Sequence, residues 1–224
     1  MSPDALSHPN HSLSDRIAAW SAEHASDFPK EVLELFAAKT EELIQSDILE
    51  NSVMEGETSP DLKLPDTFGN EISLAEKITQ GPVILSFYRG TWCPYCTIEF
   101  QALLELMPNF RNRNATVLAV SPQIKERYSD PKTAGFFDLS DEGNRVARSF
   151  GLVYPLGDEI RKVYTNFGIR LGELNGEDSY EVPIPATYLI DQNRIIRYAH
   201  ANADITQRAE PEALLDTLAG LAAA

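Results

Sequence analysis

The feature that most constrains this chain is an apolar run followed closely by two cysteines. Residues 83–88 read Val-Ile-Leu-Ser-Phe-Tyr, a pattern typical of a strand buried on both faces of a sheet. Cys93 and Cys96 follow after a short loop, and residues 94–107 read as a helix that starts at a proline and is closed by Pro108. We therefore expect both cysteines at the N-terminus of a helix that follows a central strand.

This placement of the cysteines predicts thiol chemistry. Unpaired N–H groups and the helix dipole stabilise a thiolate at a helix N-terminus, where the pKa of a cysteine falls from about 8.5 to about 3.5–7.5. A thiolate attacks disulfides and peroxides alike, and the spacing lets the second sulfur close a disulfide with the first. Half of a zinc site is the alternative, but zinc normally takes four ligands. We expect a redox-active pair, no metal and no cofactor.

Composition narrows the class of protein. The 224 residues contain only two cysteines, too few for a secreted disulfide scaffold. The net charge of −15 disfavours nucleic acid and anionic membranes as partners. No apolar run approaches the ~20 residues of a membrane span, and residues 1–10 lack the basic and apolar parts of a signal peptide. We expect a cytoplasmic protein.

Helical and strand patterns alternate along the chain, which predicts an α/β fold with a mainly parallel central sheet and helices on both faces. A helical extension is expected over residues 1–55, ahead of an α/β domain over 56–224. The extension is expected to cover the domain, with a homodimer interface as the alternative. The predicted elements are helices from residue 12 or 14 to 24 and over 29–54, a hairpin over 60–74, strands over 116–120 and 136–139, a polar helix or turn over 123–128, a helix over 141–150, a hairpin of 186–190 with 195–199, and a helix over 210–221.

Three stretches carry a family resemblance. They are Pro-Asp-Leu-Lys-Leu-Pro-Asp at 60–66, Val-Ile-Leu-Ser-Phe-Tyr-Arg-Gly-Thr-Trp-Cys-Pro-Tyr-Cys-Thr-Ile-Glu at 83–99, and Pro-Ala-Thr-Tyr-Leu-Ile-Asp at 185–191. With them, residues 56–216 resemble the alkyl hydroperoxide reductase C / thiol-specific antioxidant family, the peroxiredoxin-like proteins of the thioredoxin superfamily. The resemblance implies a thioredoxin-like fold with a central mixed sheet. It also implies a peroxide substrate and a thioredoxin-like protein or glutathione as reductant.

The chain departs from the pattern Pro-x-x-x-Thr-x-x-Cys that is typical of peroxiredoxins. When the sequences are lined up on Phe-Tyr at 87–88, Arg89 takes the proline position, Cys93 the threonine position and Cys96 that of the peroxide-attacking cysteine. Pro185 instead matches the cis-proline of thioredoxins, although an ordinary trans proline at the start of a strand is the alternative. The site therefore resembles a hybrid of the two groups, and which sulfur attacks stays open.

The candidate roles follow from this hybrid. Arg89 is expected to favour a thiolate and polarise a peroxide, or else to be a solvated or structural arginine. Thr91 is a candidate hydrogen-bond donor to a sulfur, and Trp92 and Pro185 are candidate substrate-binding residues.

Two further conspicuous residues are expected to be ordinary. Glu99 could relay a proton, although a solvated helix position is the simpler interpretation. His200 is expected to be a packed or capping histidine.

Three functions remain open at this stage. The first is a thiol-dependent peroxidase with an antioxidant role in cell redox homeostasis, which cycles through a sulfenate and a disulfide of Cys93 and Cys96. The second is a protein disulfide oxidoreductase that uses the same dithiol. The third is a redox-inert binding protein that works through its N-terminal helices.

Overall fold

The computed structural model describes residues 12–124 and 135–222 of the chain. No helix in this described part is long and apolar enough to cross a membrane. The helices are α1 Leu13–His24, α2 Lys30–Ile44, α3 Leu74–Ile78, α4 Pro94–Glu105, α5 Met107–Arg111, α6 Arg145–Ser149, α7 Gly157–Asn166, α8 Leu171–Asn175 and α9 Pro211–Ala222. The strands are β1 Lys63–Pro65, β2 Glu71–Ser73, β3 Val83–Phe87, β4 Thr116–Ser121, β5 Phe136–Ser140, β6 Val153–Pro155, β7 Glu181–Pro183, β8 Ala186–Ile190 and β9 Ile196–Ala201.

A mixed sheet forms the centre of the molecule, in the strand order β5-β4-β3-β8-β9. Strands β3, β4 and β5 run parallel, whereas β8 pairs antiparallel with β3 and β9 pairs antiparallel with β8. The predicted α/β class with a central mixed sheet is therefore confirmed. Phe87 lies opposite Val120 on one side and Ala186 on the other. The carboxyl end of β3 thus meets the amino end of β8, and the chain leaves β3 there toward the two cysteines.

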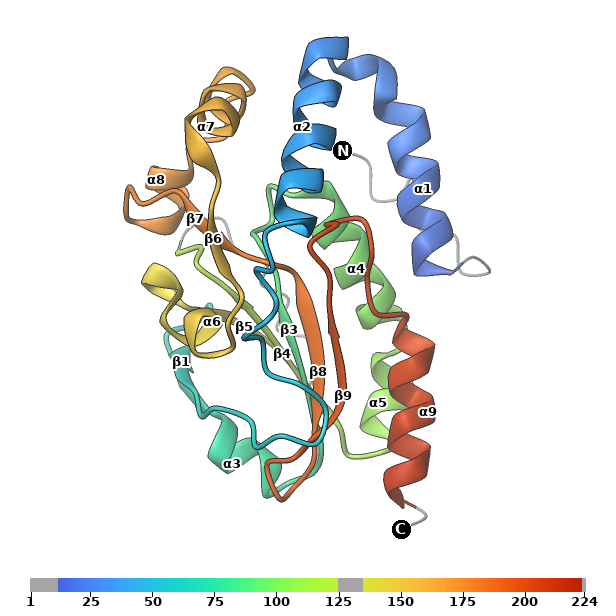
Figure 1. The fold of residues 1–224 in the computed structure, drawn as a ribbon. Coiled ribbons are helices and arrows are strands. Elements are labelled where there is room, and N and C mark those ends of the chain that lie inside the picture. The colour runs from blue at the N-terminus through green and yellow to red at the C-terminus, as the bar shows by residue number, and fades with distance from the viewer. Residues whose placement is uncertain (1–11, 125–134, 223–224) are drawn as a thin grey trace.

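The sheet is covered on both faces, which explains why residues 83–88 are apolar almost throughout. Side chains of β3 alternate between two hydrophobic clusters, with Leu85 and Phe87 in one and Ile84 and Tyr88 in the other. Figure 1 shows α4, α5 and α9 on one side of the sheet and α3, α6 and the β1–β2 hairpin on the other. The cluster beneath α4 and α9 also contains both cysteines. The redox pair is thus built into the core on this face.

The helices α1 and α2 pack against the rest of the chain, in keeping with the expectation that they cover the domain (Figure 1). Leu13 and Ile17 of α1 form a hydrophobic cluster with Ile98 and Ala102 of α4. Helix α2 lies beside α7, and its partly buried apolar side chains join the cluster that contains Tyr164. Helix α1 therefore covers α4, and α2 covers α7. A homodimer interface through their outer faces stays a prediction.

Three predicted helices are wrong in extent. Helix α2 ends at Ile44 and not near residue 54, because the chain turns through Asp47 at φ +53°. The helix that starts at Pro94 ends at Glu105, and α5 begins at Met107, so that Pro108 lies in the first turn of a new helix and does not close the old one.

The predicted helix over 141–150 is interrupted by a left-handed pair. Gly143 has φ +73° and Asn144 has φ +56°, so only residues 145–149 form an α-helix after a short 3-10 turn. The strands β6 and β7 and the helices α7 and α8 were not predicted. The polar helix or turn expected over 123–128 lies almost wholly outside the described residues.

Candidate redox site

Cys93 and Cys96 lie where the sequence predicts them, at the start of the helix after β3. Cys93 is the N-cap of α4, and Pro94 occupies the first helical position. Both are free thiols, and their exposed fractions are only 2% and 1%. The N–H of Cys93 donates to the carbonyl of Gly90 at 3.1 Å, which fixes the loop that enters the helix. The dithiol is therefore preformed and almost wholly shielded from bulk solvent.

The two thiols have opposite tendencies to ionise. A hydrogen bond from the thiol of Cys96 is the main cause that lowers the pKa of Cys93 to about 5, against the opposing effect of burial. The positive charges of Arg89 and Arg208 lower this pKa further. Burial, together with the hydrogen bond to Cys93, raises the pKa of Cys96 well above its usual range. Cys93 is therefore the thiolate at neutral pH, and Cys96 is the thiol that hydrogen-bonds to it.

Arg89 lies inside the site and is not a solvated side chain, since its exposed fraction is 3%. Its Nη2 donates to the hydroxyl of Tyr164 at 2.6 Å, and its guanidinium carbon lies 4.9 Å from the centre of the Trp92 ring. Burial raises the pKa of Tyr164 to about 12, so that this hydroxyl stays neutral. The partners of the Arg89 cation are thus neutral, so its positive charge is not cancelled and acts on the Cys93 thiolate.

A second buried cation, Arg208, stands next to Cys96. Its Nη2 lies 3.8 Å from the Sγ atom of Cys96, and its Nη1 forms an ion pair with Glu99. Glu99 also accepts hydrogen bonds from the hydroxyls of Thr187 at 3.1 Å and Ser86 at 3.4 Å. The interpretation of Glu99 as a solvated helix residue is therefore wrong, because its carboxylate is bonded inside the core.

Sequence reasoning missed Arg208 and Tyr164. Arg208 precedes α9, 112 positions from Cys96, and Tyr164 lies on α7, 75 positions from Arg89. Neither residue forms part of a recognisable local motif. Glu99 offered a usable signal, because a residue three positions after Cys96 shares its face of the helix.

The other predicted site residues lie around the dithiol. The N–H of Thr91 donates to Oε1 of Gln123 at 2.8 Å, and the Thr91 hydroxyl accepts from Nε2 of Gln123 at 3.0 Å. Pro185 is buried directly before β8, where β8 meets the end of β3. The described residues contain no cis peptide bond, so Pro185 follows a trans bond and the expected likeness to a thioredoxin cis-proline is wrong.

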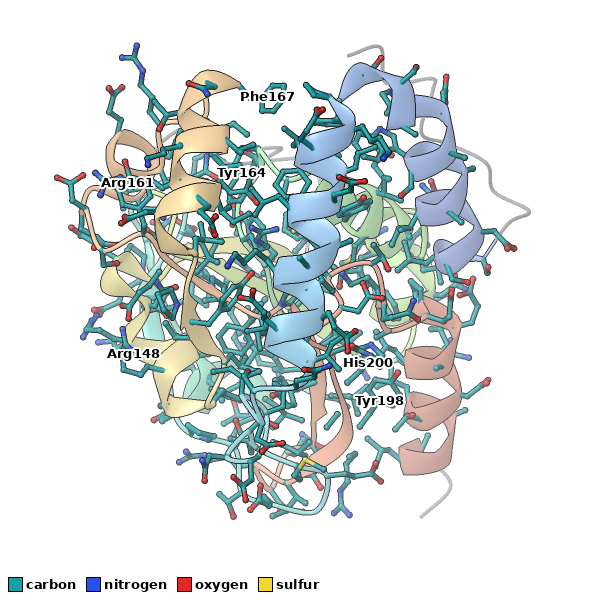
Figure 2. The ribbon with its side chains drawn as sticks, turned by 45° about the horizontal axis from the view of Figure 1, so that its top comes forward. Arg148, Arg161, Tyr164, Phe167, Tyr198 and His200 are labelled. Atoms are coloured by element: carbon teal, nitrogen blue, oxygen red, sulfur yellow. The ribbon has the colours of Figure 1, made fainter. Side chains whose placement is uncertain are left out.

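His200 lies on β9, and Figure 2 shows it below the end of α2. Its cross-strand partner is Thr187, which bonds to Glu99. The ring is partly buried, in keeping with the packed histidine that the sequence predicts.

The chain is similar in sequence to known proteins. The family described as AhpC/TSA family matches residues 56–199. Thiol-disulfide oxidoreductase ResA of Geobacillus thermodenitrificans (strain NG80-2) is 31% identical over 164 residues, which cover 71% of this chain and 78% of that protein. Peroxiredoxin Bcp of Escherichia coli (strain K12) is 29% identical over 105 residues, which cover 46% of this chain and 67% of that protein.

The fold is also similar to solved structures. The crystal structure of peroxidoxin BcpB from Mycobacterium tuberculosis superposes with a TM-score of 0.54 and 23% identity, covering 75% of this chain and 97% of that chain. A mutant of the peroxiredoxin 6 of Arenicola marina gives a TM-score of 0.57 at 14% identity and covers 76% of this chain and 74% of that one. These likenesses show a shared thioredoxin-like fold.

Proposed function

This chain is an oxidoreductase that belongs to the AhpC/TSA family, and on this premise we propose that it is a thiol-dependent peroxidase for hydrogen peroxide or small organic hydroperoxides. The observation that carries the proposal is the Cys93 thiolate, whose pKa is about 5 although the side chain is 2% exposed. A thiolate that is ionised but shielded is suited to a reactant of a few atoms. A protein disulfide needs far more open surface around the attacking sulfur.

The proposed cycle starts at Cys93. Its thiolate attacks one oxygen of the peroxide, the O–O bond breaks, and Cys93 becomes a sulfenic acid while the other oxygen leaves as water or an alcohol after taking a proton. The guanidinium of Arg89 stabilises the negative charge that develops on the leaving oxygen. This assignment of the attacking sulfur follows the ionisation of the pair, whereas alignment with the Pro-x-x-x-Thr-x-x-Cys pattern points to Cys96.

Cys96 completes the cycle as the resolving thiol. Its sulfur attacks the sulfenic acid at Cys93, water leaves, and a Cys93–Cys96 disulfide forms. Cys96 must lose its proton to attack, although burial raises its pKa. The Arg208 cation, 3.8 Å from its sulfur, favours the thiolate that forms in this step. A thioredoxin-like protein or glutathione then returns the disulfide to two thiols. We place this cycle in the cytoplasm, where the pair would rest reduced between turnovers.

A protein disulfide oxidoreductase is the second candidate. It is favoured by the similarity to a thiol-disulfide oxidoreductase and by the lowered pKa of the first cysteine in Cys-Pro-Tyr-Cys. In this alternative Cys93 attacks a protein disulfide and Cys96 resolves the mixed disulfide, with Trp92 and Pro185 lining the partner's path. A redox-inert binding protein has no evident use for a buried, ionised dithiol.

Two assays run in parallel discriminate the candidates. The reduced protein is given hydrogen peroxide with either thioredoxin or glutathione as electron donor, and separately given insulin as a protein disulfide. We expect catalytic peroxide consumption that is lost in Cys93→Ser, together with insulin reduction that is no faster than in the absence of the protein. Insulin reduction without peroxide consumption would reverse the assignment in favour of the oxidoreductase.

A further inference from the structure

The two N-terminal helices precede residues 56–199, which match the family, and each reaches the edge of the redox pair. On α1, the Trp20 ring meets the Tyr95 ring edge to face with centroids 5.4 Å apart, and the Ser21 hydroxyl donates to the Tyr95 hydroxyl at 3.2 Å. Tyr95 stands between the two cysteines in the sequence. Helix α1 therefore fixes the aromatic side chain on one side of the dithiol.

Helix α2 reaches the site through a chain of aromatic rings. Its Phe36 ring lies 6.2 Å from the ring of Tyr164, which in turn lies 5.1 Å from the Trp92 ring. Figure 2 shows Tyr164 on the side of α7 that faces α2. Because Tyr164 also accepts the hydrogen bond of Arg89, α2 packs on the residue that holds this cation in the site.

The two helices are held with unequal strength. Helix α1 buries Leu13 and Ile17, its first N–H groups donate to the carboxylate of Glu210 at 2.7 and 2.9 Å, and Arg16 pairs with Glu105. No side chain of α2 is fully buried. A half-exposed ion pair between Lys39 and Glu159, at 3.0 Å, fastens it to α7. Segments with little buried apolar surface open at low free energy, so α2 is the part that can move.

We propose that α1 and α2 form a selectivity cover, residues 13–44, that admits reactants of peroxide size to Cys93 and excludes reactants of protein size unless α2 leaves α7. The inference rests on the proposed peroxidase function, which it deepens by naming what limits the size of the reactant. It also assigns Phe36 and Lys39 as specificity-determining residues. Lys39→Glu is the most direct way to loosen the cover, because it sets a negative charge against Glu159 of α7, and also against Glu42 of α2 itself, and leaves the core untouched.

The test compares two reagents that carry the same thiol-reactive group, a maleimide, and differ in size. In a Cys96→Ser background, where Cys93 is the only thiol, N-ethylmaleimide and the same maleimide on a long polyethylene glycol chain are reacted with the full chain. We expect the bulky reagent to react more slowly than the small one. Lys39→Glu should raise the rate of the bulky reagent by roughly two- to fivefold and leave the rate of the small reagent unchanged, since an exposed ion pair contributes at most about 1 kcal/mol.

Two further variants make the result specific. Lys30→Glu makes the same charge change on α2, where Lys30 pairs with the exposed Glu34 of the same helix, and should leave the rates of both reagents unchanged. Adding Glu159→Lys to Lys39→Glu restores an ion pair between α2 and α7. The rate at which the bulky reagent reacts with Cys93 should then return toward that of the parent protein. Circular dichroism confirms that each variant is folded, and Phe36→Leu provides a second variant that loosens the same contact.

Equal rates for the two reagents in the parent protein would overturn the proposal, as would a Lys39→Glu variant that raises both rates by the same factor. Neither reagent is a peroxide, so this outcome does not depend on peroxidase activity. A protein that discriminates reagents by size but consumes no peroxide would refute the proposed function alone.

Discussion

The Nη2 atom of Arg208 lies 3.8 Å from the Sγ atom of Cys96, and the same guanidinium forms an ion pair with Glu99 inside the core. The side chains of Arg208 and Glu99 are 2% and 3% exposed. A buried pair of this kind adds little net stability over apolar residues, but the loss of one partner leaves an uncompensated charge in a medium that solvates it poorly. Arg208 therefore links the stability of the fold to the surroundings of the Cys96 thiol.

The first prediction concerns this pair. Arg208→Met should lower the free energy of unfolding by about 3–5 kcal/mol, because Glu99 is left buried and unpaired. Urea unfolding of the reduced protein measures the change. Arg170→Met is the matched control, because its pair with Glu173 is exposed and should contribute less than about 1 kcal/mol. The double variant Arg208→Met with Glu99→Met should lose less than the single variant. Equal losses in Arg208→Met and Arg170→Met would contradict the account.

The second prediction concerns the cation beside Cys93. Arg89→Met should raise the pKa of Cys93, since the Arg89 charge is one of the causes that lower it. We also expect peroxide-driven oxidation at neutral pH to slow by about a hundredfold, as when one donor to a developing anion is lost. Tyr164→Phe removes only the hydroxyl that accepts from Arg89 and should slow the reaction much less. Stopped-flow Trp fluorescence gives both rates, and similar losses in the two variants would show that orientation matters more than charge.

The third prediction is the pH profile of the reactive thiol. The folded pKa of Cys93 lies at about 5, below that of an ordinary cysteine, so the thiolate fraction falls as the pH is lowered through about 5 and is nearly constant above pH 7. The alkylation rate of Cys93 with iodoacetamide should follow this fraction. Cys96→Ala removes the hydrogen bond that is the main cause of the low pKa, and should shift the midpoint of the profile upward. A midpoint near pH 8.5 in the wild type would refute the assignment of Cys93 as the thiolate.

The fourth prediction concerns the loop that enters the site. Gly90 has φ +141°, and a Cβ atom there would overlap the indole nitrogen of Trp92 and lie 2.7 Å from Oε1 of Gln123. Gly90→Ala should therefore destabilise the protein by about 1–3 kcal/mol and displace Trp92 from Arg89. Thermal unfolding and near-UV circular dichroism report the two effects. Gly143→Ala is the control with positive φ and free space around the Cβ, and it should not alter the Trp92 signal.

Local patterns allowed most of the central fold to be predicted. The buried strand over 83–88, the helix start at Pro94 and the hairpin of β8 and β9 are each encoded in a short stretch of sequence. Helix ends were predicted less well, because the turn at Asp47 depends on a left-handed conformation that aspartate adopts only in some surroundings, so the residue type alone does not mark the turn. Helix α7 was missed because it is mostly polar, and it buries only Ile160 and Tyr164.

Only the part of the site that lies in one short stretch of sequence could be predicted. The two cysteines and Arg89 fall within one local motif, whereas Arg208 and Tyr164 reach them only through tertiary packing. The trans bond before Pro185 and the burial of Glu99 likewise depend on the surrounding structure and not on neighbours in the sequence.

The location of the sulfenic acid tests the central claim most directly. Cys96→Ser and Cys93→Ser, each fully reduced, are exposed to one equivalent of hydrogen peroxide, trapped with dimedone and analysed by peptide mass spectrometry. The account predicts rapid formation of a sulfenic acid at Cys93 in Cys96→Ser, and little or none at Cys96 in Cys93→Ser. A sulfenic acid that forms quickly at Cys96 and not at Cys93, or no adduct in either variant, would contradict it.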